Sequence, residues 1–237
     1  MVQRFTFSTV LVMSEVPEDI EETVVQRFKE ELKDPVKLVF FTQEMECPFC
    51  AQTHKLLETV VKLSDKITFE VVNFAKDKEK AEQLGIEKIP ALAILGKKDY
   101  GLRMFGIPSG YEFQTLIEGI VFASTGNSEL SPKAEEALRK VATKPVKIQI
   151  FVIPTCPVCP VLGAMAFQFA IASSNISVDI VEIAEFPHLA IKYDVIGTPK
   201  AVLNEKVQFE GLVPPGQFLT YIQQAAQGSP TGISPTI

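Results

Sequence analysis

The chain has 237 residues, 46% hydrophobic and 22% charged, a composition typical of a globular protein with room for two units of roughly 100 residues each. Its formal net charge of −6 argues against a nucleic-acid partner, because a phosphate-binding surface needs clustered Lys and Arg. No apolar run reaches the about 18 residues that a membrane-spanning helix needs, so no membrane partner is expected.

The N-terminal stretch, residues 1–13, contains Arg4 and an apolar run from Phe5 to Met13, as a short signal peptide would. Polar residues interrupt this run, and no small-x-small cleavage site precedes the acidic region Glu15–Glu22. We therefore expect no signal peptide and a cytoplasmic location.

The first half of the chain alternates short and long apolar patterns. Short runs rich in β-branched and aromatic residues predict strands, and longer segments with apolar residues at helical spacing predict helices. In chain order we expect helix 17–33, strand 36–41, helix 48–64, strands 67–73 and 91–95, and an amphipathic helix 111–124.

The second half repeats this order after a turn-rich connection at 124–132, so we divide the chain into units 1–126 and 127–237. Ser131 is a suitable N-cap for the first helix of this half, with Pro132 at the first helical position. The expected elements are helix 132–143, strand 147–152, helix 157–173, strands 177–183 and 201–204, helix 217–226, and a frayed tail at 228–237.

The four cysteines form two close pairs, Cys47/Cys50 and Cys156/Cys159, each between a predicted strand and a predicted helix. An x-Pro dipeptide lies 43 positions after the first cysteine of each pair, ending at Pro90 and Pro199. The same features in the same order indicate an internal duplication.

A Cys-x-x-Cys motif at a helix start suits thiol–disulfide exchange. The positive end of the helix stabilises a thiolate, and such motifs lower a thiol pKa from about 8.5 to about 3.5–7.5. We expect Cys47 and Cys156 to face solvent and act as nucleophiles, and Cys50 and Cys159 to resolve the mixed disulfides.

The alternative for two such pairs is a structural zinc site. Pairs that share a zinc ion are typically about 15–20 residues apart. Here 105 residues lie between Cys50 and Cys156, so we expect no metal.

The strand–Cys-Pro-x-Cys–helix pattern followed by x-Pro resembles the thioredoxin superfamily. Cys-Pro-Phe-Cys at 47–50 and Cys-Pro-Val-Cys at 156–159 are closer to the glutaredoxin motif than to that of thioredoxin. Together with the segments at 105–113 and 155–160, the tandem pattern resembles the two-domain protein disulfide oxidoreductases of archaea and thermophilic bacteria.

This resemblance implies an α/β chain with two tandem thioredoxin-like folds, each a central mixed β-sheet flanked by helices. It implies that Pro90 and Pro199 are cis-prolines beside the sulfurs, with Ile89 and Thr198 available to pair with a substrate strand. It further implies protein disulfides and dithiols as substrates, a thioredoxin-reductase-like flavoprotein as partner, and no cofactor besides the two redox-active disulfides.

The sequence departs from thioredoxin at the buried Asp six positions before the first cysteine, where it has Phe41 and Ile150. Glu44 and Glu46 precede only the first pair, and nearby negative charge disfavours a thiolate. We therefore expect Cys156 to be the more acidic thiol and the first pair to be the more reducing.

Other polar residues receive no catalytic role from the sequence. His54 is interpreted as a helix-surface residue, and His188 is expected in a loop. Glu70 and Glu182 lie in or beside predicted strands, where ordinary strand positions explain them.

Three alternative functions stay open: a glutathione-dependent glutaredoxin, an electron donor to a peroxidase, and a non-catalytic chaperone that binds unfolded chains near the two special prolines. The sequence leaves the direction of the reaction open, because this depends on reduction potential and on the partner reductase.

Overall fold

The computed structural model describes residues 16–228. The stretch considered above as a signal peptide and the tail after residue 228 lie outside these residues.

The two halves of the described chain have the same order of elements. The first contains α1 (Glu18–Glu31), β1 (Val36–Thr42), α2 (Cys50–Lys62), β2 (Ile67–Asn73), α3 (Lys78–Gln83), β3 (Ala91–Leu95), β4 (Asp99–Phe105) and α4 (Glu112–Thr125). The second contains α5 (Pro132–Val141), β5 (Val146–Val152), α6 (Cys159–Ala172), β6 (Ile176–Glu182), α7 (Pro187–Lys192), β7 (Lys200–Leu203), β8 (Val207–Glu210) and α8 (Pro215–Gln227). Every predicted helix and strand is present within a few residues of its predicted ends.

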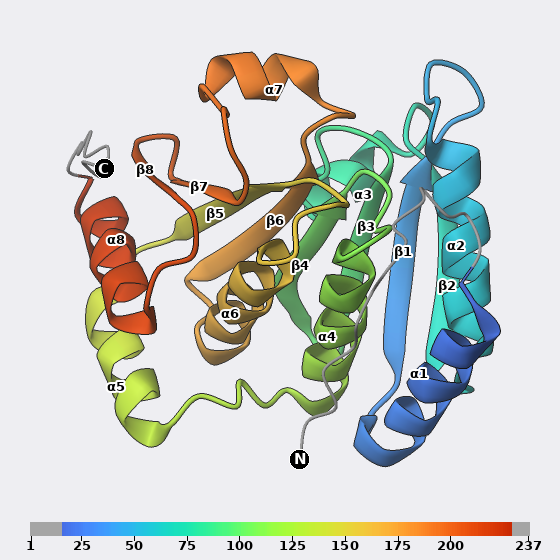
Figure 1. The fold of residues 1–237 in the computed structure, drawn as a ribbon, viewed down its shortest axis with the longest axis horizontal. Coiled ribbons are helices and arrows are strands. Elements are labelled where there is room, and N and C mark those ends of the chain that lie inside the picture. The colour runs from blue at the N-terminus through green and yellow to red at the C-terminus, as the bar shows by residue number, and fades with distance from the viewer. Residues whose placement is uncertain (1–15, 229–237) are drawn as a thin grey trace.

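The strands of both halves form one mixed sheet, in the order β2-β1-β3-β4-β6-β5-β7-β8 (Figure 1). In each half the first strand pairs parallel with the second and antiparallel with the third. The halves join where β4 pairs parallel with β6, in a register that runs from Leu102↔Val178 to Phe105↔Val181. The predicted α/β class with two similar units is confirmed, and the shared sheet is an addition to it.

The two faces of the sheet carry separate cores, because successive side chains of a strand point to opposite faces. Phe40 belongs to the core under α1, α2, α4, α5, α6 and α8, whereas the next residue, Phe41, belongs to the core under α3 and α7. One face of the sheet is therefore covered by α1, α2, α4, α5, α6 and α8, and the other face by the short helices α3 and α7.

The seam between the halves holds buried charges on the face under α3 and α7. Arg103 of β4 lies opposite Asp179 of β6, and its guanidinium binds Asp99 at 2.5 Å. Lys147 lies 3.1 Å from the Asp179 carboxylate, and burial raises the pKa of Asp179 despite the nearby cations. Since each of these charges has a partner of opposite sign, the seam can be buried.

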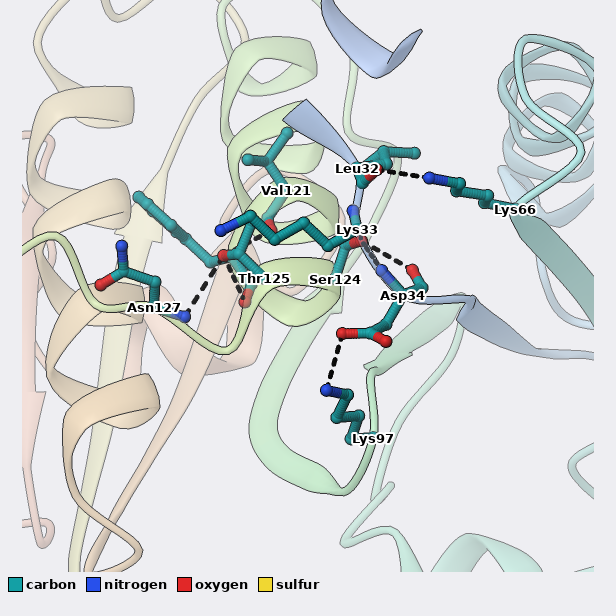
Figure 2. Close-up of polar contacts among 10 residues, drawn as sticks. Leu32, Lys33, Asp34, Lys66, Lys97, Val121, Ser124, Thr125 and Asn127 are labelled. Carbon is teal, nitrogen blue, oxygen red and sulfur yellow. Dashed lines mark hydrogen bonds and ion pairs between the residues drawn. The ribbon is translucent and has the colours of Figure 1, made fainter. Parts of the chain in front are cut away.

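Helix α4 ends against the turn between α1 and β1 (Figure 2). The Ser124 hydroxyl accepts the backbone N–H groups of Lys33 at 3.0 Å and Asp34 at 3.1 Å, and donates to the Asp34 carbonyl at 2.6 Å. The Asp34 carboxylate in turn binds Lys97 at 2.9 Å. These contacts hold the start of β1 in place relative to α4.

The structure differs from the predicted elements in three places. Helices α2 and α6 begin at Cys50 and Cys159, so Pro48 and Pro157 precede them. Strands β4 and β8 and helices α3 and α7 have no counterpart among the elements predicted above. The expectation that His188 lies in a loop is wrong: it lies in α7, whose six residues are too few to show a helical period.

Candidate active site

Both Cys pairs lie at the same edge of the sheet. Strands β1 and β5 run in the same direction through the chain of pairings β1–β3–β4–β6–β5, and each leads into its own Cys pair. Four strand spacings of about 4.8 Å separate the two strands, which puts their ends about 19 Å apart. The two sites therefore face the same side of the molecule but do not touch.

The first pair forms a disulfide between the turn after β1 and the first residue of α2. The Cα atoms of Cys47 and Cys50 are 5.4 Å apart, and the Cys50 N–H donates to the Cys47 carbonyl at 3.3 Å. Cys47 is partly exposed and Cys50 is buried, as expected for a nucleophile and its resolving partner.

The second pair has the same local geometry but is more covered. The Cα atoms of Cys156 and Cys159 are 5.5 Å apart in a disulfide, and the two residues are 6% and 0% exposed. The turn before Cys156 is held by the first half of the chain, since the Tyr111 N–H donates to the Pro154 carbonyl at 2.9 Å. Cys156 is therefore less exposed than the sequence led us to expect.

The starts of α2 and α6 favour a negative sulfur. Neither helix has an acidic residue in its first turn, and neither has a side chain hydrogen-bonded at its N-cap. No capping side chain or carboxylate of the helix itself therefore competes with a thiolate for the positive end of the helix dipole.

The two x-Pro bonds, Ile89–Pro90 and Thr198–Pro199, are both cis. The residues that follow them, Ala91 and Lys200, pair with the ends of the strands that lead to the cysteines. At the second site the Thr198 carbonyl oxygen lies 3.7 Å from Cys156 Sγ. Backbone next to each proline is thus held beside a Cys pair.

Glu112, the first residue of α4, lies on the side of α4 that packs against α6, the helix that begins at Cys159. An ideal Cβ on Gly163 would lie 3.0 Å from Thr115, and one on Gly119 would lie 2.9 Å from Phe167, so these two contacts between α4 and α6 share an offset of 48 residues.

Continued one turn toward the helix starts, the same offset pairs residue 111 with Cys159 and Glu112 with Pro160, which brings the start of α4 next to the start of α6. The two helices lie side by side in Figure 1. The Thr115 hydroxyl donates to Glu112 Oε2 at 2.8 Å, and Thr115 packs against α6, so the Glu112 carboxyl is held on the side of α4 that faces α6.

The Glu112 carboxyl belongs to a buried acidic group. Burial, reinforced by the negative charge of Glu182, raises the pKa of Glu112 to about 8, although the hydrogen bond from Thr115 acts in the opposite direction. Burial also raises the pKa of Glu182 and raises that of Glu185 to about 7. Carboxyl groups with a pKa near neutrality are suited to proton transfer.

Glu112 was not singled out from the sequence, and Glu182 was given no role. A carboxylate in the first turn of a helix is an ordinary surface feature, because it interacts favourably with the helix dipole. The only sequence signal was the small residues Gly119 and Gly163, which permit close helix packing but do not name the partner helix.

Other polar candidates lie on the surface around the first site. His54 packs against Phe40 and Phe69 at ring-centroid distances of 5.7 and 5.6 Å and lies 3.6 Å from Glu58, one helical turn later. Glu70 binds both Lys37 and Lys80, and these hydrogen bonds lower its pKa. These contacts describe a packed helix face and a surface ion-pair cluster.

The four cysteine sulfurs form two separate disulfides and do not converge on one point. Between residues 16 and 228, no group of three or more His, Cys, Asp or Glu side chains is arranged to hold a metal ion. Over the same residues, no helix is long and apolar enough to cross a membrane.

Sequence comparison finds relatives for the second half of the chain. A family model described as "Thioredoxin domain" matches residues 146–224. A thioredoxin from Methanocaldococcus jannaschii is 31% identical over 67 residues, which are 28% of this chain and 79% of that protein.

Structural comparison finds matches to the whole tandem arrangement. A protein disulfide oxidoreductase from Aeropyrum pernix K1 matches with a TM-score of 0.83 and 27% identity, over 94% of this chain and 97% of that one. The alkylhydroperoxide reductase protein AhpF from Enterococcus faecalis matches with a TM-score of 0.81 and 23% identity, over 87% of this chain and 99% of the matched chain. At 23% identity, the match to AhpF shows a shared fold alone.

Proposed function

Because this chain belongs to the thioredoxin family and is a thiol–disulfide oxidoreductase, we propose that it acts on the disulfides and dithiols of other proteins through both of its Cys pairs. The observation that carries the proposal is the repeated geometry: each pair closes a disulfide at the start of an uncapped helix, beside the backbone of a cis-proline.

The reaction proceeds by two exchanges at each pair. The thiolate of Cys47 or Cys156 attacks a substrate disulfide, forms a mixed disulfide and releases one substrate thiolate, which takes up a proton. Cys50 or Cys159 then attacks the mixed disulfide and releases the second substrate thiol. Two electrons pass to the substrate, the enzyme pair ends as a disulfide, and oxidation of a substrate dithiol runs the same steps in reverse.

Ile89 and Thr198 hold the substrate in this proposal. An extended segment around the substrate cysteine pairs with their backbone, as in β-strand addition, and this aligns its sulfur with the nucleophile. The 3.7 Å distance between the Thr198 carbonyl and Cys156 Sγ supports this arrangement at the second site.

Glu112 serves the second pair as a proton acceptor. Cys159 must lose its proton before it can resolve a mixed disulfide, and the buried carboxyl at the neighbouring start of α4 can take that proton. Because Glu112 belongs to the first half of the chain, the proposed unit 1–126 completes the site of the proposed unit 127–237.

The remaining parts of the proposal concern the cellular setting. A thioredoxin-reductase-like flavoprotein would return electrons to the pairs, and a cytoplasmic location stays a prediction. The likeness to the alkylhydroperoxide reductase protein makes donation of electrons to a peroxidase a second candidate, but the greater identity to the archaeal disulfide oxidoreductase favours protein disulfides.

The test is reduction of insulin disulfides with dithiothreitol, followed by turbidity, for the wild-type protein and the Cys47→Ser and Cys156→Ser variants. We expect acceleration by the wild type and loss of most of it in Cys156→Ser. No acceleration by the wild type would contradict the proposal, and a strict requirement for glutathione as reductant would favour the glutaredoxin alternative. Activity toward unfolded proteins that survives replacement of all four cysteines would favour a chaperone.

A further inference from the structure

Three carboxyl groups and one hydroxyl group lie together where the 106–112 segment of the first half meets the end of β6. Glu185 Oε1 accepts the Ile107 N–H at 2.6 Å, and Glu182 accepts the N–H groups of Ala184 and Glu185 at 3.2 and 2.9 Å. An ideal Cβ on Gly106 would lie 2.7 Å from Glu182 Cβ and 2.8 Å from Glu185 Oε1, so the absence of a side chain there allows this close approach.

Three polar atoms of this group are buried without a partner. Among the described residues, no group hydrogen-bonds to Ser109 Oγ, Glu112 Oε1 or Glu185 Oε2. Ser109 and Glu112 are 2% and 1% exposed. The backbone keeps them close, since the Glu112 N–H donates to the Ser109 carbonyl at 3.1 Å. Such atoms are uncommon in proteins, and a bound water or a role in proton transfer accounts for them.

We propose that Glu182 and Glu185, with a water molecule held by Ser109 and Glu112, form a proton path between solvent and the Glu112–Cys159 pair. The inference rests on the proposed function, because it concerns the proton that Cys159 gives up during exchange. It goes beyond that function by assigning roles to Ser109, Glu182 and Glu185.

The order of burial gives the path its direction. Glu112 is 1% exposed, Glu182 is 5% exposed at the end of β6, and Glu185 is only partly buried, next to the exposed Ala184. The charge of Glu182 on β6 acts on both Glu112 and Glu185. The groups therefore lead from the buried thiol toward the surface.

The proton balance of the second exchange requires such a path. When Cys159 attacks the mixed disulfide, its S–H proton passes to the Glu112 carboxylate. The Cys156–Cys159 bond forms, the bond from Cys156 to the substrate sulfur breaks, and the electron pair leaves with the substrate thiolate, which takes a proton from solvent. The proton on Glu112 then leaves through the water and the two carboxylates, so that Glu112 is restored for the next cycle.

The test follows the resolving step alone, in the full-length chain with Cys47→Ser and Cys50→Ser. Reduced protein reacts with 5,5′-dithiobis(2-nitrobenzoate) in two phases: the first thionitrobenzoate is released when Cys156 attacks, and the second when Cys159 resolves the mixed disulfide. Rates are compared in dilute and concentrated imidazole buffer, because a small base can carry protons in place of a missing carboxylate.

Glu185→Gln is the decisive variant, because Gln keeps an oxygen that accepts the Ile107 N–H but carries no transferable carboxyl proton. We expect the second phase to slow by about tenfold in dilute buffer, within the range lost with a proton-transfer group, and to recover in imidazole, with the first phase unchanged. Glu136→Gln, in an exposed ion pair with Lys140 on α5, is the matched control and should behave like the parent protein.

Two outcomes would overturn the path. One is a second phase in Glu185→Gln that equals the parent rate at every imidazole concentration. The other is a slow second phase in Glu185→Ala that imidazole does not restore while Glu185→Gln is normal, because Glu185 would then only position Ile107. If the parent protein releases no second thionitrobenzoate, Cys159 does not resolve the mixed disulfide. The proposed function of the second pair is then contradicted, and so is the proton path that depends on it.

Discussion

At the scale of single residues, the two nucleophile candidates differ in their surroundings. Cys47 is partly exposed and follows the exposed Glu44 and Glu46, whereas Cys156 is 6% exposed. Negative charge near a sulfur and burial of a sulfur both disfavour a thiolate, and we expect the two glutamates within three residues of Cys47 to outweigh the burial of Cys156, so that Cys156 of the reduced protein is alkylated at lower pH than Cys47. Exposure of the two glutamates to solvent keeps the difference small.

Iodoacetamide labelling against pH, with the two cysteine peptides separated by mass spectrometry, measures this difference. Removal of the charges in a Glu44→Gln, Glu46→Gln variant should bring the Cys47 curve toward that of Cys156. Equal curves in the wild type, or a reversed order, would show that the acidic residues do not set the asymmetry.

Glu112 makes a second prediction at this scale, on stability. Its pKa is raised from 4.5 to about 8 by burial, so between these values the folded chain binds more protons than the unfolded chain. The stability is then fully present below pH 4.5 and falls as the pH rises through about 8. Glu112→Gln should remove this dependence and stabilise the oxidised protein at pH 9 by on the order of a few kcal/mol.

Urea unfolding of oxidised wild type and Glu112→Gln at pH 5 and pH 9 tests the prediction. Glu118→Gln is a control that also lies on α4, but its carboxylate is paired with Arg27 at 2.8 Å. If the variant shows the same loss of stability between the two pH values as the wild type, Glu112 is not the group that titrates.

At the scale of elements, α4 is the centre of the molecule. It was predicted to be amphipathic, yet all but three of its 14 residues are buried, because α1, α6 and the sheet surround it. Its C-terminal end also contacts the β3–β4 turn, where an ideal Cβ on Gly96 would overlap the carbonyl oxygen of Ala123. Because the overlapping oxygen belongs to the backbone, no rotation of a side chain can relieve this contact.

Gly96→Ala should therefore destabilise the protein by about 3 kcal/mol or more, as overpacking against a fixed backbone does. Gly216→Ala is the matched control, since nothing lies within 4 Å of its ideal Cβ in the first turn of α8. We expect that control to be neutral or stabilising by less than about 1 kcal/mol. Equal urea midpoints for the two variants would contradict the close contact at Gly96.

At the scale of the whole molecule, the shared sheet sets the spacing of the two sites. The ends of β1 and β5 are about 19 Å apart, whereas a disulfide needs Cα atoms within about 7 Å. Cys47 and Cys156 should therefore not bond to one another within one chain, and exchange of electrons between the sites needs a third thiol.

A Cys50→Ser, Cys159→Ser variant tests this arrangement, because only the two nucleophile candidates remain. After treatment with diamide at low protein concentration, we expect a monomer with both thiols free to react with a maleimide. The wild-type protein, treated alike, should close both local disulfides and leave no thiol. A monomeric variant that lacks free thiols would show that the units move far enough to bring the sites together.

The sequence by itself determined the features that depend on neighbouring residues. The Cys pairs, the helix starts, the strands and the matched x-Pro positions follow from local periodicity and from spacing repeated in both halves. The cis form of Pro90 and Pro199 was reached through the resemblance, because an x-Pro bond considered alone is usually trans.

Only the tertiary structure decided what the two halves do to one another. The β4–β6 pairing uses backbone hydrogen bonds that any two strands can form, so no residue pattern announces it. The packing of α4 on α6 accompanies that pairing and brings the start of α4, with Glu112, to the helix that begins at Cys159, although 46 residues lie between Glu112 and Cys159. A carboxyl that looks like an ordinary helix start acquires its raised pKa from burial, and burial is a property of the assembled fold.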